Sequence, residues 1–301
     1  MTLGGIGEIV MPSSIVQPLV SVIIPTFDRA AWLGEAIASV LAQTYPHLEL
    51  LVVDDGSHDA TAEVVQGFGA ALTYIRQARA GVSAARNRGV AASRGALVAF
   101  LDSDDVWLPR KVAAQVTLLQ QQPHAQACYT DEIWIRHGVR VNPRQIHQKH
   151  SGWLFEPSLP RCIISPSSIM LRRTLWDQLG GFDESFQACE DYDLWLRLTL
   201  RTPVVLLPER LIVKRGGHAD QLSHCVPVLD QYRITALEKI LTAPLSLSQR
   251  RAVLAHLVQK CRIVAQGAQK RQHAARWALY HAKEQHYRQQ LADVLETAEA
   301  L

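Results

Sequence analysis

Two uninterrupted apolar runs of strand length each lead into a group of acidic residues. The run Leu50–Val53 is followed by Asp54-Asp55, and the run Ala96–Leu101 is followed by Asp102-Ser103-Asp104-Asp105. Continuous apolar runs of this length are typical of strands buried on both faces, as in parallel sheets. Ligands of open α/β sheets bind at the carboxyl ends of the strands, so both acidic groups are expected at one binding edge. Because carboxylates gathered there repel one another unless a cation lies among them, the pattern favours a divalent metal that carries phosphates.

Length and composition narrow the class of protein. The chain has 301 residues, of which 48% are apolar and 20% are charged, so it can bury a large core. A net charge of +3 is too mild to indicate a nucleic-acid partner, and none is expected. The five cysteines are odd in number and scattered, which fits reduced thiols better than disulfides or a zinc site.

Targeting signals are not evident in the sequence. No apolar run approaches the roughly 20 residues that span a bilayer. Met1–Gln17 lacks the positively charged start of a signal peptide. The sequence therefore predicts a soluble, cytoplasmic protein with a flexible tail over residues 1–18.

Strand and helix patterns alternate over residues 20–122, as in a doubly wound sheet. The segment from residue 127 to 207 has an α+β pattern that continues the same sheet, with its last strand at Val204–Leu207. Ser57 or Asp59 is expected to cap a helix that runs to about Phe68. After about Val228 the pattern is helical only, with a stop expected at Gly267. The predicted organisation is a domain over 19–227 and a helical extension over 228–301.

The segment Asp102–Asp105 is the strongest candidate site. Two carboxylates at positions i and i+2, next to a third, can share Mg²⁺ or Mn²⁺ and the phosphates that the metal carries. The alternative is a helix N-cap, with Asp104 or Asp105 accepting amide hydrogen bonds ahead of Pro109. Capping accounts for one aspartate and leaves the others unexplained.

Three further segments carry candidate residues, each with a plainer alternative. Arg86 follows the helix start at Gly81, a combination that favours an anion such as diphosphate, although it could be a solvated basic face. Glu190-Asp191 could supply a general base, or could only complement a helix dipole. His218 lies in a glycine-flanked loop that could approach phosphate, or could be a surface histidine.

Taken together, these segments resemble the family 2 glycosyltransferases, which are inverting enzymes of the GT-A fold. The resemblance covers about residues 20–224 and depends on five motifs in the expected order and spacing. These are Val20–Arg29, Val52–Ser57, Gly81–Gly89, Phe100–Asp105, and Gly180–Glu184 with Glu190–Arg197. It implies an α/β fold with a Rossmann-like mixed sheet flanked by helices, followed here by a C-terminal helical appendage.

The resemblance also implies roles for individual residues. Asp191 matches the catalytic base, and Glu190 is placed with the substrate-binding residues. The nucleotide site would be formed by Pro25 and Thr26, by Asp55 at the base (commonly uracil), by Arg86 near the base or diphosphate, and by Asp102 near the ribose. The metal, Mn²⁺ or Mg²⁺, would be bound by Asp104, with His218 as a looser correspondence. Asp54 and Asp105 are expected to be structural neighbours of these residues.

The expected partners follow from that reaction: a nucleotide-sugar donor and a glycan or lipid-linked acceptor of cell-surface polysaccharide synthesis. The stretch from Arg136 to His150 and the loop near Trp153 are expected to form the acceptor pocket. The C-terminal helices hold nine Lys and Arg against four Asp and Glu over residues 245–301, so contact with the inner membrane face and a homodimer both stay open, beside a simple packing role.

Other protein classes fit the sequence less well. A sugar-1-phosphate nucleotidyltransferase would have a glycine-rich basic loop where this chain has Pro25–Arg29. A receiver module is about 120 residues long, much shorter than this chain. A non-catalytic nucleotide- or glycan-binding relative is disfavoured by the complete set of acidic residues.

Overall fold

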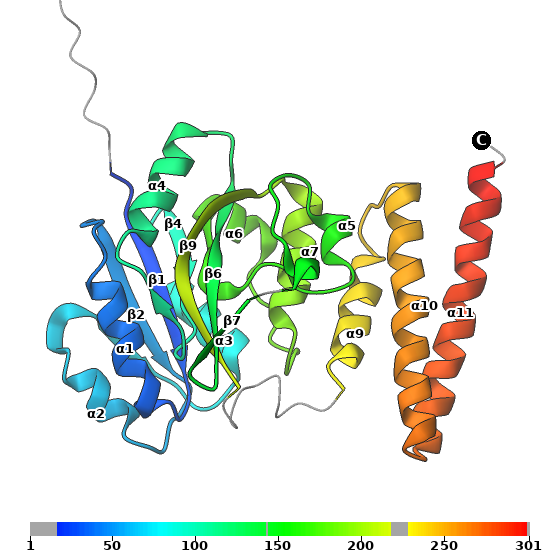
Figure 1. Ribbon diagram of the computed structural model, residues 1–301, viewed down its shortest axis with the longest axis horizontal. Helices are drawn as coiled ribbons and strands as arrows, with labels where there is room; N and C mark the ends of the chain where they lie inside the picture. Colours follow the sequence, from blue (N-terminus) through cyan, green and yellow to red (C-terminus); the bar gives the residue numbers. More distant parts are fainter. Residues whose placement is uncertain (1–16, 143, 218–227, 300–301) are drawn as a thin grey trace, which may run out of the picture.

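The computed structural model describes residues 17–142, 144–217 and 228–299 (Figure 1). A single curved sheet is flanked by helices on both faces, and a group of helices continues from one end of it. The strands are β1 (Val20–Thr26), β2 (Leu48–Asp54), β3 (Thr73–Arg76), β4 (Leu97–Phe100), β5 (Val106–Trp107), β6 (Ala127–Arg136), β7 (Val139–Val141), β8 (Ile169–Arg172) and β9 (Val205–Gly216).

The helices alternate with the strands in the first half of the chain and predominate in the last part. They are α1 (Ala30–Leu41), α2 (Thr61–Gln66), α3 (Val82–Ala92), α4 (Lys111–Gln121), α5 (Phe155–Ser158), α6 (Arg173–Leu179), α7 (Glu190–Arg201), α9 (Asp230–Ile240), α10 (Leu247–Lys270) and α11 (Ala274–Glu299). Short 3₁₀ turns are η1 (Gly69–Ala71), η2 (Gln145–His147) and η3 (Pro166–Ser168).

The strand directions place most strand ends at one edge. Among the described residues the strand order is β3-β2-β1-β4-β8-β6-β9-β5, with β7 paired to β6. β1, β2, β3 and β4 are parallel, and β8 is antiparallel to both β4 and β6. Therefore β6, and β9 parallel to it, point the same way as β4. The second half of the chain extends the first sheet, as predicted.

The last strand is longer than the sequence pattern indicates. β9 runs to Gly216, whereas the apolar run ends at Leu207. Its register against β6 shifts on both sides of Asp131, in the stretch that contains Pro208. Proline cannot donate to the strand ladder, and an irregular register interrupts the alternation that marks a strand in the sequence.

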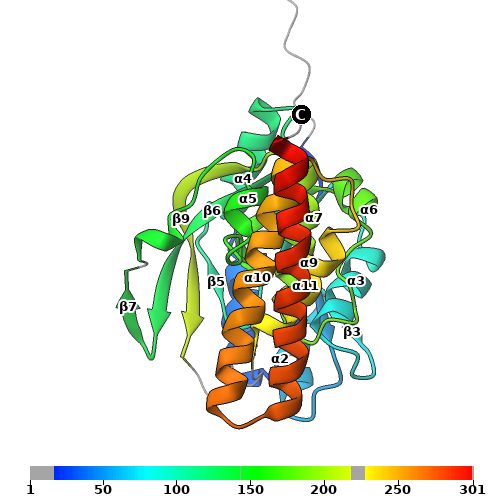
Figure 2. The same cartoon turned by 90° about the vertical axis from the view of Figure 1, so that its right-hand side faces the viewer.

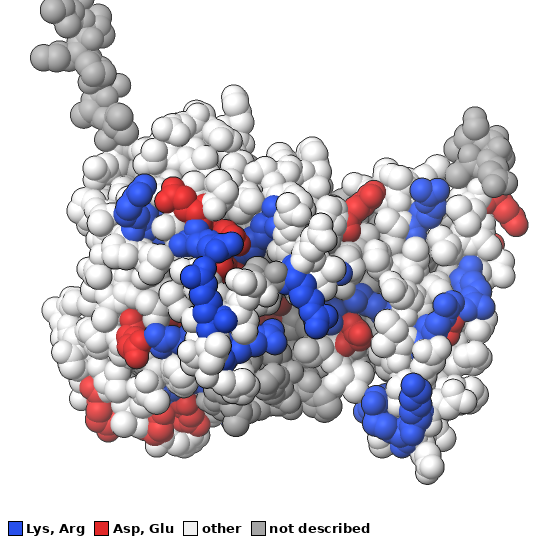
Figure 3. Space-filling view, viewed as in Figure 1, with Lys and Arg blue, Asp and Glu red and all other residues white. Residues whose placement is uncertain are grey.

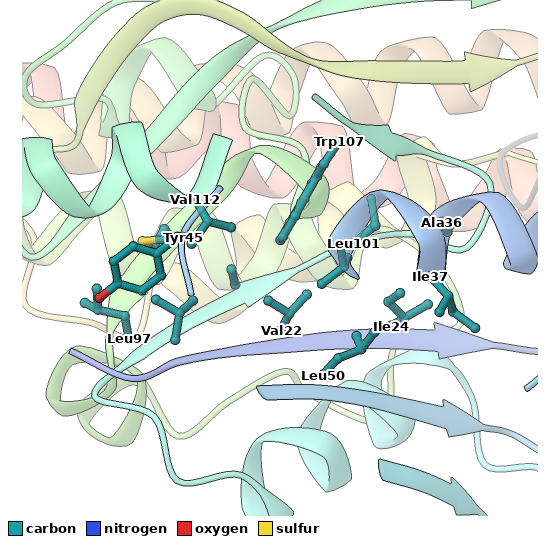
Figure 4. Close-up of a cluster of buried hydrophobic side chains, with 14 of the residues drawn as sticks. Val22, Ile24, Ala36, Ile37, Tyr45, Leu50, Leu97, Leu101, Trp107 and Val112 are labelled. Carbon is teal, nitrogen blue, oxygen red and sulfur yellow. The ribbon is translucent and has the colours of Figure 1, made fainter. Parts of the chain in front are cut away.

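Two cores cover the two faces of the sheet. Because successive side chains of a strand point to opposite faces, Val22 and Ile24 of β1 pack with α1, whereas Ile23 packs with α3. Figure 4 shows the first of these cores, in which Trp107, Leu101 and Ile37 lie over the sheet. Every residue of β1 is buried, which explains the continuous apolar run in the sequence.

A third core joins the C-terminal helices to the rest of the molecule. Tyr192 and Leu196 of α7 pack with residues of α9, α10 and α11. α10 and α11 form an antiparallel hairpin that runs the full height of the molecule (Figure 2). Among the described residues, none of the helices is long and apolar enough to cross a bilayer.

Two helix boundaries differ from the sequence expectation. α10 continues through Gly267, because Val264, Ala265 and Ala268 around it are buried, and this packing offsets the roughly 1 kcal/mol by which glycine disfavours a helix. α2 ends at Gln66 and does not reach Phe68. The N-cap of α2 is Ala60, so the expected cap by Ser57 or Asp59 is wrong; Asp59, one residue earlier, accepts a hydrogen bond from the amide of Thr61 at 3.0 Å.

Candidate functional site

The ends of β1 and β2 are bound to each other. The amide of Asp55 donates to the carbonyl of Thr26 at 2.9 Å. Asp54 is fully buried, and its carboxylate accepts from the amide of Ser57 at 2.8 Å and from the Tyr74 hydroxyl at 2.6 Å. These contacts within the fold are consistent with a structural role for Asp54.

Asp55 organises the loop that leads into α3. Its carboxylate accepts hydrogen bonds from the side chain of Gln77 at 2.7 Å and from the amides of Ala80 and Gly81, both at 2.8 Å. Three donors are thus already bound to the residue expected to bind the base. Its role as a base-binding residue stays a prediction, with the formation of this loop as a second role.

Pro25 and Thr26 lie at the carboxyl end of β1, where a ligand is expected. Pro25 pairs with Val53 in the register of β1 and β2. The hydroxyl of Thr26 is buried and finds no hydrogen-bond partner within the described part of the chain. Because an unpaired buried hydroxyl is costly, this atom is a candidate contact for a bound nucleotide.

Arg86 joins the two acidic motifs. Its guanidinium donates to Asp102 Oδ1 and to Glu190 Oε1, each at 2.7 Å, although the two acids are far apart in the sequence. The side chain is only 4% exposed, so the alternative of a solvated basic face is wrong for this residue. Burial alone would lower the pKa of Arg86, but Asp102 and Glu190 raise it above its usual value.

The loop after β4 separates its aspartates into two environments. Asp102 and Asp104 are partly exposed, whereas Asp105 is buried. Asp105 accepts from the Ser167 hydroxyl at 2.6 Å and from the amide of Arg215 at 3.0 Å. These partners are not in the helix that follows, so the helix-cap alternative is wrong for Asp105. Burial, with the nearby charges of Asp104 and Asp102, raises the pKa of Asp105 well above its usual value.

The carboxylates suit a divalent cation that is shared with a substrate. Asp102 and Asp104 offer the hard oxygen ligands that Mg²⁺ and Mn²⁺ prefer. Their negative charges also repel that of Asp105, since they raise its pKa. Within residues 17–142, 144–217 and 228–299, no group of three His, Cys, Asp or Glu side chains could hold a metal. A metal here would need oxygens of a bound diphosphate or water as well. His218 lies outside the described residues.

The start of α7 presents Asp191 and buries Glu190. Glu190 is paired with Arg86, and burial raises its pKa by more than Arg86 lowers it. Asp191 is partly exposed, and one carboxylate oxygen accepts from the amide of Tyr192 at 2.7 Å. Its other oxygen lies 3.3 Å from the Cys162 thiol, which donates to it. A carboxylate that is partly exposed and is oriented by two hydrogen bonds can accept a proton from a bound hydroxyl.

Sequence reasoning missed Lys214, which lies near the end of β9. Burial would lower the pKa of Lys214, but the nearby carboxylates raise it above its usual value. The carboxylates that raise it belong to Glu132, Asp105, Asp102 and Asp191. The lysine therefore contributes positive charge to the acidic edge. The available signal was the short apolar run Leu211–Val213 directly before Lys214, which lies beyond the predicted end of the strand at Leu207.

The segment expected to form the acceptor pocket is only partly at this edge. The side chain of Lys149 is only 8% exposed and binds Glu132 at 3.1 Å, which attaches the segment to β6. Trp153 is 62% exposed, but the bridge between Gly152 and Val204 places it beside the start of β9. The acidic residues lie at the opposite ends of the strands.

Two family profiles match the sequence. The profile described as glycosyl transferase family 2 matches residues 21–179, which is more than half of the chain. The chain belongs to glycosyltransferase family 2. A profile described as glycosyltransferase like family 2 matches residues 152–223, the part that contains Asp191.

Proteins named as glycosyltransferases are similar in sequence over most of the chain. It is 31% identical over 219 residues to an uncharacterised glycosyltransferase of Rickettsia prowazekii (strain Madrid E), covering 71% of this chain and 69% of that protein. It is 32% identical over 182 residues to the Escherichia coli UDP-Glc:alpha-D-GlcNAc-diphosphoundecaprenol beta-1,3-glucosyltransferase WfgD, covering 60% of this chain and 69% of that protein.

Solved structures share the fold at low sequence identity. S. aureus TarS in complex with UDP-GlcNAc superposes with a TM-score of 0.64 at 18% identity, covering 90% of this chain and 91% of that one. The mannosyltransferase PcManGT from Pyrobaculum calidifontis, in complex with GDP-Man and Mn²⁺, gives a TM-score of 0.60 at 18% identity, covering 92% and 88%. The family 2 transferase described here therefore has the predicted GT-A fold, with a mixed sheet flanked by helices and a C-terminal helical region.

Proposed function

We propose that this family 2 glycosyltransferase moves a sugar, with inversion, from a UDP-linked donor to a hydroxyl of a glycan or lipid-linked acceptor. The product would be part of a cell-surface polysaccharide. The name of the E. coli relative supports both the UDP donor and the lipid-linked acceptor, and the TarS complex with UDP-GlcNAc supports the donor class. The PcManGT complex, which holds Mn²⁺ with its donor, supports a divalent metal.

The observation that carries this proposal is the position of Arg86 between the two acidic motifs. Its two ion pairs of 2.7 Å bring the loop after β4 beside the start of α7. The aspartates that suit a metal and diphosphate thus lie next to Asp191. A transferase requires both groups in one place, because the acceptor must approach the anomeric carbon while the diphosphate departs.

Asp191 would act as the general base. It takes the proton from the acceptor hydroxyl as that oxygen forms a bond to the anomeric carbon. The bond between the anomeric carbon and the diphosphate oxygen breaks at the opposite face, which inverts the configuration. The products are the glycoside, a nucleoside diphosphate and protonated Asp191. The partly exposed carboxylate of Asp191 is available for this step.

The donor would be held by the other residues of this edge. Thr26 and Asp55 would contact the nucleoside, and Asp102 and Asp104 would contact the ribose and diphosphate. A divalent cation bound by Asp104 and the diphosphate oxygens would neutralise charge on the leaving group. Lys214 adds a fixed positive charge to the same edge.

A screen of nucleotide sugars tests this function. Donor hydrolysis and thermal stability are measured with a panel of nucleoside diphosphates and nucleotide sugars, with and without Mn²⁺. UDP or a UDP-sugar should raise the melting temperature, and the increase should be larger with metal. The function would be abandoned if no nucleoside diphosphate stabilised the protein under either condition.

Two substitutions in the same assay separate binding from chemistry. Asp191→Asn should lower transfer by at least about 1000-fold while leaving UDP binding nearly intact, because it removes only the base. Asp104→Ala should weaken UDP binding only in the presence of metal. Asp177→Asn, an exposed aspartate of α6, is the matched control and should change neither quantity. Loss of UDP binding in Asp191→Asn would assign that residue to the structure of the site.

A further inference from the structure

Basic residues are strongly segregated in the C-terminal helices. Between Glu238 and Glu284 the sequence contains nine Lys and Arg residues and no Asp or Glu. This stretch comprises the end of α9, all of α10 and the first part of α11. A long segment of one charge sign indicates attraction to a partner of the opposite sign, unless acids elsewhere in the fold neutralise it.

Part of this charge is neutralised by acids outside the stretch. Among the described residues the ion pairs are Lys239 with Asp183 and Asp193, Lys260 with Asp230, Arg262 with Glu284, and Lys283 with Glu238. Those basic side chains serve to pack the helices together. In contrast, Lys270, Arg271 and Arg276 form no ion pair with any described residue. Arg250 and Arg251, near the start of α10, likewise form no ion pair with described residues. Three of the five unneutralised charges therefore lie at the turn between α10 and α11, and two lie at the opposite end of α10.

The turn lies well beyond a contact that joins α10 to the sheet domain. Lys260 donates to the carbonyl of Pro160 at 3.0 Å, and this contact anchors α10 ten residues before its last residue, Lys270. With 24 residues α10 is roughly 36 Å long, so the turn lies roughly 15 Å beyond that anchor. In Figure 1 the turn lies on the same side of the molecule as the carboxyl ends of β1 and β9, and Figure 2 shows the same for β9. Figure 3 shows Lys and Arg side chains gathered at this lower end of the hairpin.

Large apolar side chains are exposed near the turn. Trp277 is 38% exposed, and its indole ring stacks on the ring of His281 with centroids 5.3 Å apart. Leu279 and Ile263 are 53% and 50% exposed. Indole rings beside Lys and Arg are typical of segments that lie at a membrane–water interface, where the ring enters the headgroup layer and the cations contact lipid phosphates.

We propose that the hairpin tip, defined as Lys270, Arg271, Arg276 and Trp277, docks on an anionic membrane surface. The three cations bind lipid phosphate groups and Trp277 inserts among the headgroups. Because the tip and the acidic edge lie on one side of the molecule, docking turns the active site toward the membrane. A second copy of the chain fits the tip less well, since two tips of the same charge repel each other. The proposal concerns docking alone and holds for any donor sugar.

Vesicle sedimentation tests the docking. The full chain is mixed with vesicles of phosphatidylcholine alone or of phosphatidylcholine with phosphatidylglycerol, at low and high salt. The protein should bind only the vesicles with phosphatidylglycerol, and binding should weaken as salt is added. The triple change Lys270→Gln, Arg271→Gln, Arg276→Gln should reduce binding on the order of 100-fold at low salt. Trp277→Ser should reduce it about tenfold.

A matched control separates the tip from net charge. Arg94→Gln, Arg110→Gln and Arg201→Gln remove the same charge from exposed sites at the other edge of the sheet and should leave vesicle binding unchanged. All variants should keep the melting temperature and the donor hydrolysis of the unmodified chain, so a failed docking test is distinct from a failed transferase assignment. Absence of binding to anionic vesicles, an equal loss in the control, or a tip-dependent dimer without vesicle binding would each overturn the proposal.

Discussion

At the scale of single residues, the site depends on contacts that connect distant parts of the chain. The acidic motifs could be located in the sequence because they follow apolar runs and belong to a family pattern. The contact that joins the two motifs in space could not be located in the sequence. Arg86 is predicted to lie near the base or diphosphate, and the structure adds that it lies buried between Asp102 and Glu190. Nothing in the sequence near Arg86 indicates these partners, because they come from other elements through the fold of the sheet.

Glu132 offers a residue-scale test that is independent of the reaction. It is 3% exposed, binds Lys149 at 3.1 Å and accepts a hydrogen bond from Trp134 Nε1 at 2.8 Å. Burial alone would raise its pKa, but Lys214 and Lys149, with hydrogen bonds from Ser165 and Trp134, lower the pKa of Glu132 to about 2. A lowered pKa means that the ionised form stabilises the folded state. This stabilisation is complete above the usual glutamate pKa and is lost as the pH falls through about 2.

Glu132→Gln should therefore destabilise the protein most at neutral pH. The lowered pKa corresponds to about 3 kcal/mol of pH-dependent unfolding free energy, which the glutamine variant lacks. Urea unfolding at several pH values between about 7 and 3 measures the difference between the two proteins, which should narrow as the solution is acidified. Glu156→Gln, at an exposed position, should give a small and constant difference. A constant large difference for Glu132→Gln would contradict the ionised pair.

At the scale of elements, periodicity located most helices and strands but not their ends. The missed part of β9 is informative, because Pro208 and the register shift interrupt the strand pattern before the segment that contains Lys214. The continuation of α10 through Gly267 was missed for the opposite reason. There a local signal, the glycine, was outweighed by packing between elements. Both errors arise where tertiary contacts override the local pattern.

The close packing of α3 against β1 is expected to be necessary for the site. Gly89 faces β1, and a Cβ at this position would lie 2.5 Å from Ile23 Cγ2 and 3.1 Å from Val53 Cγ2. The branched core residues of β1 and β2 cannot withdraw freely, so Gly89→Ala should push α3 away from the sheet. We expect a loss of about 1–3 kcal/mol in unfolding free energy. Because Arg86 is on the same helix, transferase activity should fall as well.

The control for this change is another helical glycine. Gly34 of α1 would place a Cβ 3.7 Å from Val64 Cγ1, an ordinary contact distance. Gly34→Ala should leave stability unchanged or raise it by up to about 1 kcal/mol, since alanine favours a helix. Chemical denaturation of both variants measures the contrast. Equal effects of the two substitutions would show that the approach of α3 to β1 is not the limiting contact.

At the scale of the whole molecule, the C-terminal helices and the sheet domain share one apolar core. The sequence indicated a change of character after about Val228, because the motifs stop there and only helical periodicity remains. It could not indicate whether the helices stand apart. In the structure α7, whose first residues are Glu190 and Asp191, presents Tyr192 and Leu196 to α9 and α10. The helix that carries the proposed base is thus covered by the extension.

Removal of residues 228–301 should therefore affect more than membrane docking. It would expose Phe155, Leu159, Tyr192 and Leu196, which are at most 3% exposed in the full chain. It would also remove Lys239, whose ammonium binds Asp183 at 2.6 Å and Asp193 at 3.1 Å. Exposure of a contiguous apolar surface favours aggregation. We expect the truncated protein to be insoluble, or to melt well below the full chain and lose donor hydrolysis, as measured by sedimentation and thermal unfolding.

The four-residue change that neutralises the hairpin tip is the appropriate comparison for this truncation. Combining Lys270→Gln, Arg271→Gln, Arg276→Gln and Trp277→Ser removes docking groups but no residue of the shared core. Its melting temperature should equal that of the full chain, whereas the truncation lowers it. If the truncated chain were soluble, equally stable and active, residues 19–227 would be an independent catalytic unit. The extension would then act on location alone, and the shared core would contribute little to holding α7 in place.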